Sequence, residues 1–157
     1  MKKLLVTAFL LSIFMACNDK CCTDIDLDIQ LSFVNADDED LLDTNLENSI
    51  RSDEINLYYL INGQKVRVID NQIDRSENFN VSYSEYFKKN VLHLVVSHHL
   101  DENNQSITFL ELNQNDTDTI KCSIIERGNV TFINTVWYND QLIITNQQDG
   151  DHAVIKK

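Results

Sequence analysis

The chain has 157 residues, with 25 acidic residues against 13 lysines and arginines, so its net charge at pH 7 is −12. Nucleic acid and anionic lipid headgroups would both repel such a chain, which argues against either as a direct partner. The length is sufficient for a single domain with a hydrophobic core.

The first 16 residues have the pattern of a signal peptide. Lys2 and Lys3 form a short basic region, and the stretch Leu4–Ala16 is apolar apart from two hydroxyl residues. As a helix this stretch reaches roughly 20 Å, at about 1.5 Å per residue, which is short of the roughly 30 Å of a bilayer core. We therefore expect a cleaved targeting segment rather than a transmembrane helix.

A lipid attachment site follows this segment. Ala16 stands directly before Cys17, and Phe14-Met15-Ala16-Cys17 resembles the lipobox that signal peptidase II cleaves. Cleavage would leave Cys17 with a diacylglycerol and usually a third acyl chain such as palmitate, and two or more chains hold a protein stably on a membrane. The sequence thus predicts a tether over residues 17–23 and one domain over residues 24–157. Ordinary secretion, with Cys17 as a plain thiol, is the alternative.

Three further cysteines bear on the disulfide pattern: Cys21, Cys22 and Cys122. In an oxidising compartment they allow three pairings, each with one thiol left over. A bridge from Cys122 to Cys21 or Cys22 would close a loop of about 100 residues, worth up to roughly 4–5 kcal/mol in the chain-entropy model. A bridge between the two adjacent cysteines would close a strained ring. Their spacing does not match a zinc site.

The first strand of the domain is predicted from strict alternation. Between Asp24 and Phe33 apolar and polar residues alternate over ten positions, which is the period of a strand with one buried face. The residues predicted to be buried are Ile25, Leu27, Ile29, Leu31 and Phe33.

A long acidic segment, Asn35–Asp53, follows this strand and has no strand pattern of its own. Calcium takes six to eight oxygen ligands, often from carboxylates in a flexible loop. The candidate ligands here are Asp37, Asp38, Glu39, Asp40 and Asp43. Because the spacing of an EF-hand is missing, a solvated acidic loop is the simpler interpretation, and Ca²⁺ is the alternative.

The rest of the chain predicts short strands and tight turns. Asn62-Gly63 between Glu54–Ile61 and Gln64–Asp70 predicts a two-residue hairpin, because both central residues need positive φ. Ser84–Asn90 is compatible with a helical turn or a loop. The other predicted strands are Asn78–Tyr83, Val91–His99, Ser106–Leu112, Thr117–Arg127, Val130–Tyr138, Gln141–Asn146 and His152–Ile155. We predict an all-β fold, an antiparallel β-sandwich of eight or nine short strands, with a closed barrel as the alternative.

Residues that could carry chemistry do not form a known catalytic or metal-binding pattern. His98 and His99 would point to opposite faces of a strand, and His93 would lie near 20 Å from His99 at strand rise. His152 is isolated in the sequence, and Cys122 falls mid-strand, where a thiol is normally inert. No Gly-x-Ser-x-Gly sequence or phosphate-binding glycine loop is present.

Two pairs of adjacent aromatic residues are the best candidates for ligand contacts. Tyr58 and Tyr59 lie on one predicted strand, and Trp137 and Tyr138 on another. One member of each pair must face away from the core. An outward ring could serve as a platform for a sugar or a peptide, and packing at the rim of the core is the alternative.

Six short motifs are spread over most of the chain after Cys17: Cys21-Cys22-Thr23, Ser32-Phe33, Asp40-Leu41-Leu42-Asp43, Tyr59-Leu60-Ile61-Asn62-Gly63, Asp118-Thr119-Ile120-Lys121-Cys122 and Val136-Trp137-Tyr138-Asn139-Asp140. Together they resemble small lipoproteins that are common in Bacteroidota. The resemblance implies a β-sandwich in the cell envelope, on the outer membrane, and it implies no reaction. Asp118-Thr119-Ile120 also resembles the O-glycosylation sequence of exported proteins in that phylum, which implies a glycan on Thr119.

We therefore expect an envelope lipoprotein that acts as a non-enzymatic binding module for a glycan, a peptide or another envelope protein, and that faces either the periplasm or the cell surface. The alternatives are a structural subunit of an envelope complex and a small hydrolase that acts on envelope or dietary polymers. A concave pocket with converging carboxylates and perturbed pKa values would favour the hydrolase. An exposed aromatic strip would favour the binding module, and a long uncovered edge strand would favour assembly.

Overall fold

The computed structural model describes residues 24–68, 78–145 and 151–157, and the regular structure within them is entirely β. Within these ranges no helix has the length and hydropathy that a membrane crossing requires. The strands are β1 Asp24–Asp26, β2 Asp28–Val34, β3 Asn56–Ile61, β4 Gln64–Arg67, β5 Phe79–Ser84, β6 Lys89–Val95, β7 Gln105–Asn113, β8 Asp116–Arg127, β9 Val130–Tyr138, β10 Gln141–Thr145 and β11 His152–Lys156.

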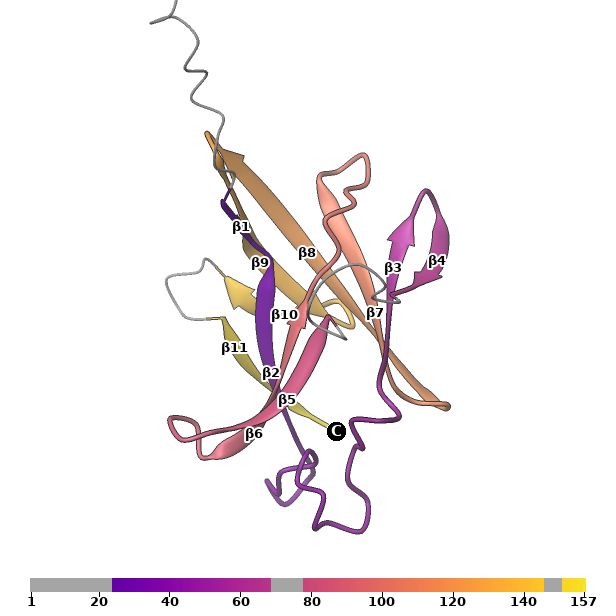
Figure 1. The fold of residues 1–157 in the computed structure, drawn as a ribbon, viewed down its shortest axis with the longest axis vertical. Helices are drawn as coiled ribbons and strands as arrows, with labels where there is room; N and C mark the ends of the chain where they lie inside the picture. The colour runs from indigo at the N-terminus through magenta and orange to yellow at the C-terminus, as the bar shows by residue number, and fades with distance from the viewer. Residues whose placement is uncertain (1–23, 69–77, 146–150) are drawn as a thin grey trace, which may run out of the picture.

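The strands form two sheets, which we call sheet A and sheet B (Figure 1). Sheet A has the order β1-β9-β8-β7-β3-β4, and β10 pairs with the same edge of β9 as β1 but further along the strand. Sheet B has the order β11-β2-β6-β5. The inward side chains of both sheets meet in one hydrophobic cluster. The fold is therefore a β-sandwich, as the sequence predicts.

Both sheets are mixed rather than purely antiparallel, and the described residues contain eleven strands rather than eight or nine. β1 runs parallel to β9, and β11 runs parallel to β2. All other pairs are antiparallel, including the long β7–β8–β9 meander. In both parallel pairs a strand from one end of the domain adds to the edge of a sheet that the rest of the chain builds. The sequence pattern cannot reveal such a pairing.

The predicted first strand is in fact two strands, which is a correction to the sequence prediction. The chain leaves sheet A after β1 and enters sheet B at β2, with buried Leu27 between them. The Leu27 carbonyl accepts a hydrogen bond from the Val96 N–H at 3.0 Å. Ile25 was expected to be buried but is 61% exposed, because β1 lies at the rim of sheet A. Leu27, Ile29, Leu31 and Phe33 are buried as predicted.

Tight turns fix the register of the hairpins. Asn62 and Gly63 have φ of 51° and 78°, which confirms the predicted two-residue turn between β3 and β4. Asn139 and Asp140 also have positive φ and join β9 to β10. The undecided segment between β5 and β6 is a turn, closed by a hydrogen bond from the Lys88 N–H to the Ser84 carbonyl at 2.8 Å.

The longest described strand, β8, has twelve residues and separates two ends of the domain. At about 3.3 Å per residue it spans roughly 35–40 Å. Asp24, the first described residue, donates a hydrogen bond to the Asn129 carbonyl in the turn beyond the end of β8. The β7–β8 turn lies at the opposite end of β8 (Figure 1).

Candidate functional site

The two aromatic pairs point as predicted, one member inward and one outward. Tyr59 and Tyr138 are buried, with 9% and 5% of their surface exposed. Tyr58 and Trp137 are partly exposed on the outer face of sheet A. The alternation of strand side chains produces this arrangement. It leaves two aromatic rings on the outside of the larger sheet.

A third aromatic side chain, Phe109, joins them on this face. The register places Tyr58 on β3 opposite Phe109 on β7, and Phe109 opposite Thr119 on β8. The Lys65 ammonium lies 4.2 Å from the centre of the Tyr58 ring and 5.2 Å from that of Phe109, so the two rings share one cation. We call Tyr58, Phe109 and Trp137 the aromatic face. Phe109 was missed from sequence, although it is an outward position of a predicted strand.

A polar hollow of about 800 Å³ opens beside Tyr58. Its walls come from the segment before β3, from β3, from the end of β4, and from the end of β7 with the β7–β8 turn. The residues that line it are Asp53, Glu54, Asn56, Tyr58, Arg67, Glu111, Asn113, Gln114 and Asn115. All but Tyr58 have a charged or amide side chain. The polar hollow therefore combines one aromatic ring with many hydrogen-bonding groups.

The groups beside Tyr58 are held in place by a chain of hydrogen bonds. The Arg67 guanidinium donates to Asn56 Oδ1, and Asn56 Nδ2 donates to Glu111 Oε1 at 3.0 Å. The same Nδ2 lies 3.1 Å from the Glu54 carbonyl. Three neighbouring strands contribute these side chains, since Asn56 pairs with Glu111 and Tyr58 pairs with Arg67 in the register. An ordered guanidinium, amide and carboxylate thus border the ring.

Negative charge predominates around the polar hollow. Asp53, Glu54 and Glu111 oppose the single cation Arg67 among the lining residues. A hydrogen bond from Arg51, 3.2 Å from Asp53, lowers the pKa of the Asp53 carboxyl, which keeps it ionised at neutral pH. An anionic ligand would therefore be repelled at the rim of the hollow.

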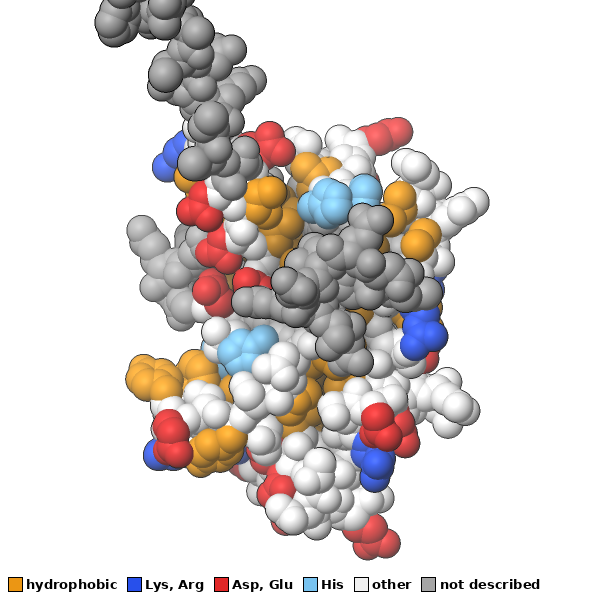
Figure 2. Space-filling view, in the orientation of Figure 1, with side chains coloured by type: hydrophobic (Ala, Val, Ile, Leu, Met, Phe, Trp, Pro, Cys, Tyr) orange, Lys and Arg blue, Asp and Glu red, His pale blue; other side chains and the backbone are white. Residues whose placement is uncertain are grey.

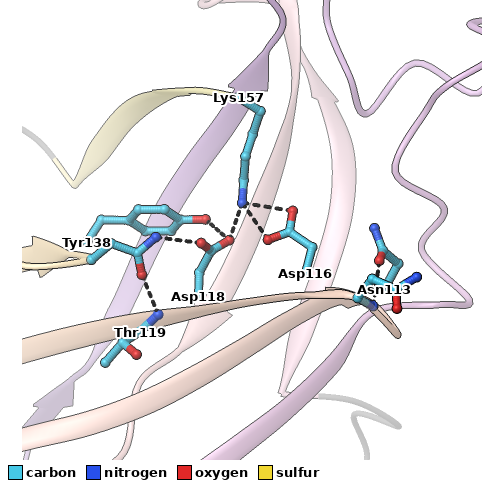
Figure 3. A network of polar contacts seen from close by, with 8 residues as sticks. Asn113, Asp116, Asp118, Thr119, Tyr138 and Lys157 are labelled. Carbon is cyan, nitrogen blue, oxygen red and sulfur yellow. Dashed lines mark hydrogen bonds and ion pairs between the residues drawn. The ribbon is translucent and has the colours of Figure 1, made fainter.

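A second polar network lies between the sheets, at the C-terminal end of the described chain (Figure 3). Lys157 Nζ contacts Asp118, and it also lies 2.9 Å from an Asp116 oxygen. Asp118 further accepts hydrogen bonds from the Tyr138 hydroxyl and, at 2.6 Å, from Asn139 Nδ2. Burial and the neighbouring Asp118 charge raise the pKa of Tyr138 well above its usual range. Both carboxylate oxygens of Asp118 have partners within the protein, so this network stabilises the packing of the two sheets.

The candidate cation ligands of the acidic loop do not converge. Asp40 accepts hydrogen bonds from the Asn90 backbone N–H at 2.6 Å and from the Asn90 side chain at 2.8 Å, which ties the loop to sheet B. Asp43 accepts from the N–H of Asn45 at 3.0 Å. Asp38 faces Lys156 at 3.5 Å, and the Asp37 N–H donates to Asn35. Within the described ranges, no group of three or more His, Cys, Asp or Glu side chains could hold a metal ion.

The prediction that His98 and His99 face opposite ways is wrong. β6 ends at Val95, so neither histidine lies in a strand, and their ring centres are 4.1 Å apart. Burial, together with the neighbouring His99, lowers the pKa of His98. Figure 2 shows the histidine side chains of one face in two separate groups.

His152 is not isolated in space. Its ring stacks on Phe87 with the ring centres 3.7 Å apart, and its Nε2 lies 3.0 Å from the Ser32 hydroxyl oxygen. Since Ser32 Oγ is also 3.0 Å from the Asn90 carbonyl, which can only accept, the hydroxyl donates there and His152 Nε2–H donates to Ser32. Burial, and then the nearby His93, lower the pKa of His152. Ser32 itself is fully buried.

Cys122 is a free, fully buried thiol on the inward side of β8. Burial raises its pKa to about 12, partly offset by the Ser106 hydroxyl beside it. Cys17, the predicted lipidation site, and the predicted bridge partners Cys21 and Cys22 lie outside the described residues. The bridge to Cys122 and the lipid anchor therefore stay predictions.

Thr119, the residue with the O-glycosylation resemblance, lies mid-strand on β8 and is partly exposed. Its backbone exchanges two hydrogen bonds with Asn139, both of 2.8 Å. Its side chain points to the outer face of sheet A, beside Phe109. A glycan on Thr119 would therefore project from the aromatic face.

Comparison of the chain with protein-family models, with characterised proteins and with solved structures finds no match. The functional argument therefore rests on the geometry of the site.

Proposed function

We propose that the protein is a non-enzymatic binding module, held in the cell envelope by a lipid on Cys17, that takes its ligand on the outer face of sheet A. The observation that carries the proposal is the aromatic face. Three strands that are distant in sequence each place one aromatic ring, Tyr58, Phe109 or Trp137, on the same outward surface. Partly exposed aromatic rings supply large contact areas at low entropic cost, which suits recognition.

The position of the polar hollow in the fold also supports display to a ligand. Asp24 lies beside Asn129, at one end of β8, whereas the hollow lies against the turn at the other end. A tether that starts at Cys17 would join the domain at the first of these ends. The hollow would then face away from the membrane, roughly 35–40 Å further out along β8.

A hydrolase is the rival hypothesis, and the Ser32–His152 contact is the arrangement that most resembles catalytic machinery. The direction of its hydrogen bonds disfavours that role, because Nε2 carries a proton and so cannot accept one from Ser32. Ser32 is also fully buried. Three carboxylates line the polar hollow, but Glu111 accepts a hydrogen bond from Asn56 and the pKa of Asp53 is lowered by Arg51, whereas a general acid needs a raised pKa.

The anchor is tested by fractionation of cells that express the full chain. We expect the wild type in the membrane fraction, and we expect the Cys17→Ala variant to have a changed electrophoretic mobility, because it loses signal-peptide cleavage and acylation. If the variant stays with the membrane at unchanged mobility, the lipoprotein assignment is wrong.

The binding role is tested by retention of the purified full-length protein, in neutral detergent, on cell-envelope material that has been extracted with the same detergent, so that the acyl chains do not contribute to retention. We expect retention of the wild type, and a loss of retention of at least tenfold for the Tyr58→Ala, Trp137→Ala double variant. Tyr83→Ala is the matched control, since Tyr83 is 55% exposed on β5 of the other sheet. Equal retention of all three proteins would contradict a role for the aromatic face, and turnover of the envelope polymer would favour the hydrolase.

A further inference from the structure

We propose that the polar hollow is a binding site for a neutral saccharide, with Tyr58 as the stacking platform and Asn56, Arg67 and Glu111 as the groups that read its hydroxyls. The inference rests on the binding function proposed above and names its ligand class. It is carried by four properties of the hollow: the ring, the ordered polar groups, the charge and the open shape.

Tyr58 supplies the apolar part of the recognition. Tyr58 is partly exposed and lines the polar hollow, and the Lys65 ammonium lies over its ring, 4.2 Å from the centre, so a sugar must take the other face or displace this flexible side chain. One face of a pyranose presents C–H groups, which pack on the electron-rich face of an aromatic ring. No other residue that lines the hollow is aromatic. Removal of this ring therefore takes away the main apolar contact.

The polar part consists of planar groups that are already in place. Arg67, Asn56 and Glu111 are joined by hydrogen bonds that fix their orientation before a ligand arrives. A guanidinium, an amide and a carboxylate together offer both donors and acceptors, as neighbouring sugar hydroxyls do. Groups ordered in advance lose little entropy when they bind, which favours affinity for a weakly hydrophobic ligand.

The charge of the polar hollow selects among saccharides. Asp53, Glu54 and Glu111 line the hollow together with one guanidinium, Arg67, and with Arg51 paired to Asp53 at 3.2 Å the local charge is still negative. Uronic acids and other anionic sugars would be repelled by this excess of negative charge. Neutral hydroxyls can instead donate to carboxylates without a charge of their own. A basic peptide is the competing ligand, because the carboxylates would attract it, but it would place its cations next to Arg67.

The shape of the hollow fits a polymer segment as well as a chain end. It is a broad depression of about 800 Å³ and includes three amide side chains from Asn113, Gln114 and Asn115. Asn113 ends β7 and the other two lie in the β7–β8 turn, so amide groups follow Glu111 along this edge of the hollow. A saccharide of more than one unit could contact both the ring and these amide groups. We therefore expect affinity to rise from mono- to oligosaccharide.

The test is affinity gel electrophoresis of the purified full-length protein in neutral detergent. The polysaccharides in the gel are laminarin, xylan and mannan, which are neutral, and polygalacturonate, which is anionic. Binding of a basic peptide, octalysine, is measured separately by calorimetry. The variants are Tyr58→Ala and Arg67→Gln, with Tyr83→Ala as the control. Arg67 is exposed at the end of β4, so we expect its replacement to leave folding intact, and it covers the case in which Tyr58→Ala destabilises the protein.

We expect at least one neutral polysaccharide to retard the wild type, both site variants to weaken the interaction at least tenfold, and the control to match the wild type. That result supports the assignment. Retardation that both site variants retain would overturn it, because the saccharide would then bind elsewhere. A preference for polygalacturonate or octalysine, or no retardation by any neutral probe, would also overturn it. Any of these contrary results would overturn the saccharide assignment only. The binding function itself is tested independently by the envelope-retention experiment.

Discussion

Lys157, which follows β11 of sheet B, places its ammonium group against the carboxylate of Asp118 on β8 of sheet A (Figure 3). The Asp118 side chain is only 5% exposed, and it also accepts hydrogen bonds from Tyr138 and Asn139. The backbone N–H of Lys157 binds the Val34 carbonyl at 2.8 Å, which fixes the base of its side chain to β2. One buried carboxylate thus joins the two layers of the sandwich.

Replacement of Asp118 should destabilise the protein. In Asp118→Ala the Tyr138 hydroxyl loses its buried acceptor, whereas Lys157 keeps Asp116 at 2.9 Å. A buried donor left without a partner costs about 1–3 kcal/mol. Chemical unfolding at pH 7 measures this change. The control is Glu85→Ala, which removes the exposed Glu85–Lys88 pair of 2.7 Å. We expect almost no effect there, because solvent screens exposed pairs. Equal stabilities of the two variants would contradict a structural role for Asp118.

The protein should lose stability in alkaline solution through Tyr59. Its hydroxyl donates to the Val95 carbonyl of the opposite sheet at 2.9 Å, and burial raises the pKa of Tyr59 to about 12. A group whose pKa is raised on folding contributes its full stability below the unfolded value near 10 and loses it as the pH rises from 10 to 12. Tyr59→Phe should be about 1 kcal/mol less stable at pH 7 but should lose less stability between pH 10 and 11. Urea unfolding at several pH values measures both effects, and an unchanged slope in the variant would contradict the assignment.

In mildly acidic solution the protein should lose stability through His152. Its ring, stacked on Phe87 beside Ser32, has a pKa below the usual 6.5 because of burial and then because of His93. The folded protein therefore takes up the proton less readily than the unfolded chain, and stability falls as the pH drops below 6.5. His152→Gln should flatten this dependence over pH 7 to 5. If the variant loses stability with falling pH as the wild type does, groups other than His152 cause the loss.

Local patterns in the sequence predict the strands and turns well, and for physical reasons. Asn62-Gly63 predicts its hairpin because few residue pairs tolerate positive φ at two successive positions. Strand periodicity predicts that one member of each aromatic pair faces outward, and the structure shows that Tyr58 and Trp137 are those members. The break at Leu27 was missed because the alternation continues through it, although the chain passes from one sheet to the other. His98 and His99 were misplaced because β6 ends earlier than its apolar pattern suggests.

The polar hollow could not be predicted in the same way, because it depends on pairing between distant strands. Asn56 and Glu111 are 55 residues apart, and Arg67 comes from a third strand. Each is an ordinary polar residue at an outward position, and only the register makes them neighbours. The contact between Lys157 and Asp118 has the same origin, since it requires the packing of one sheet on the other.

Cys122 should be unreactive as long as the protein is folded. The thiol is fully buried among the inward side chains of β8, and its pKa of about 12 leaves almost no thiolate at pH 8. In the purified full-length protein, iodoacetamide should label Cys122 only after the addition of denaturant. Mass spectrometry of peptides from the unfolded, non-reduced protein then separates two states: a labelled Cys122 is a free thiol, whereas a peptide linked to Cys21 or Cys22 is the predicted bridge. Rapid labelling of the folded wild type would contradict the burial of this side chain in the core.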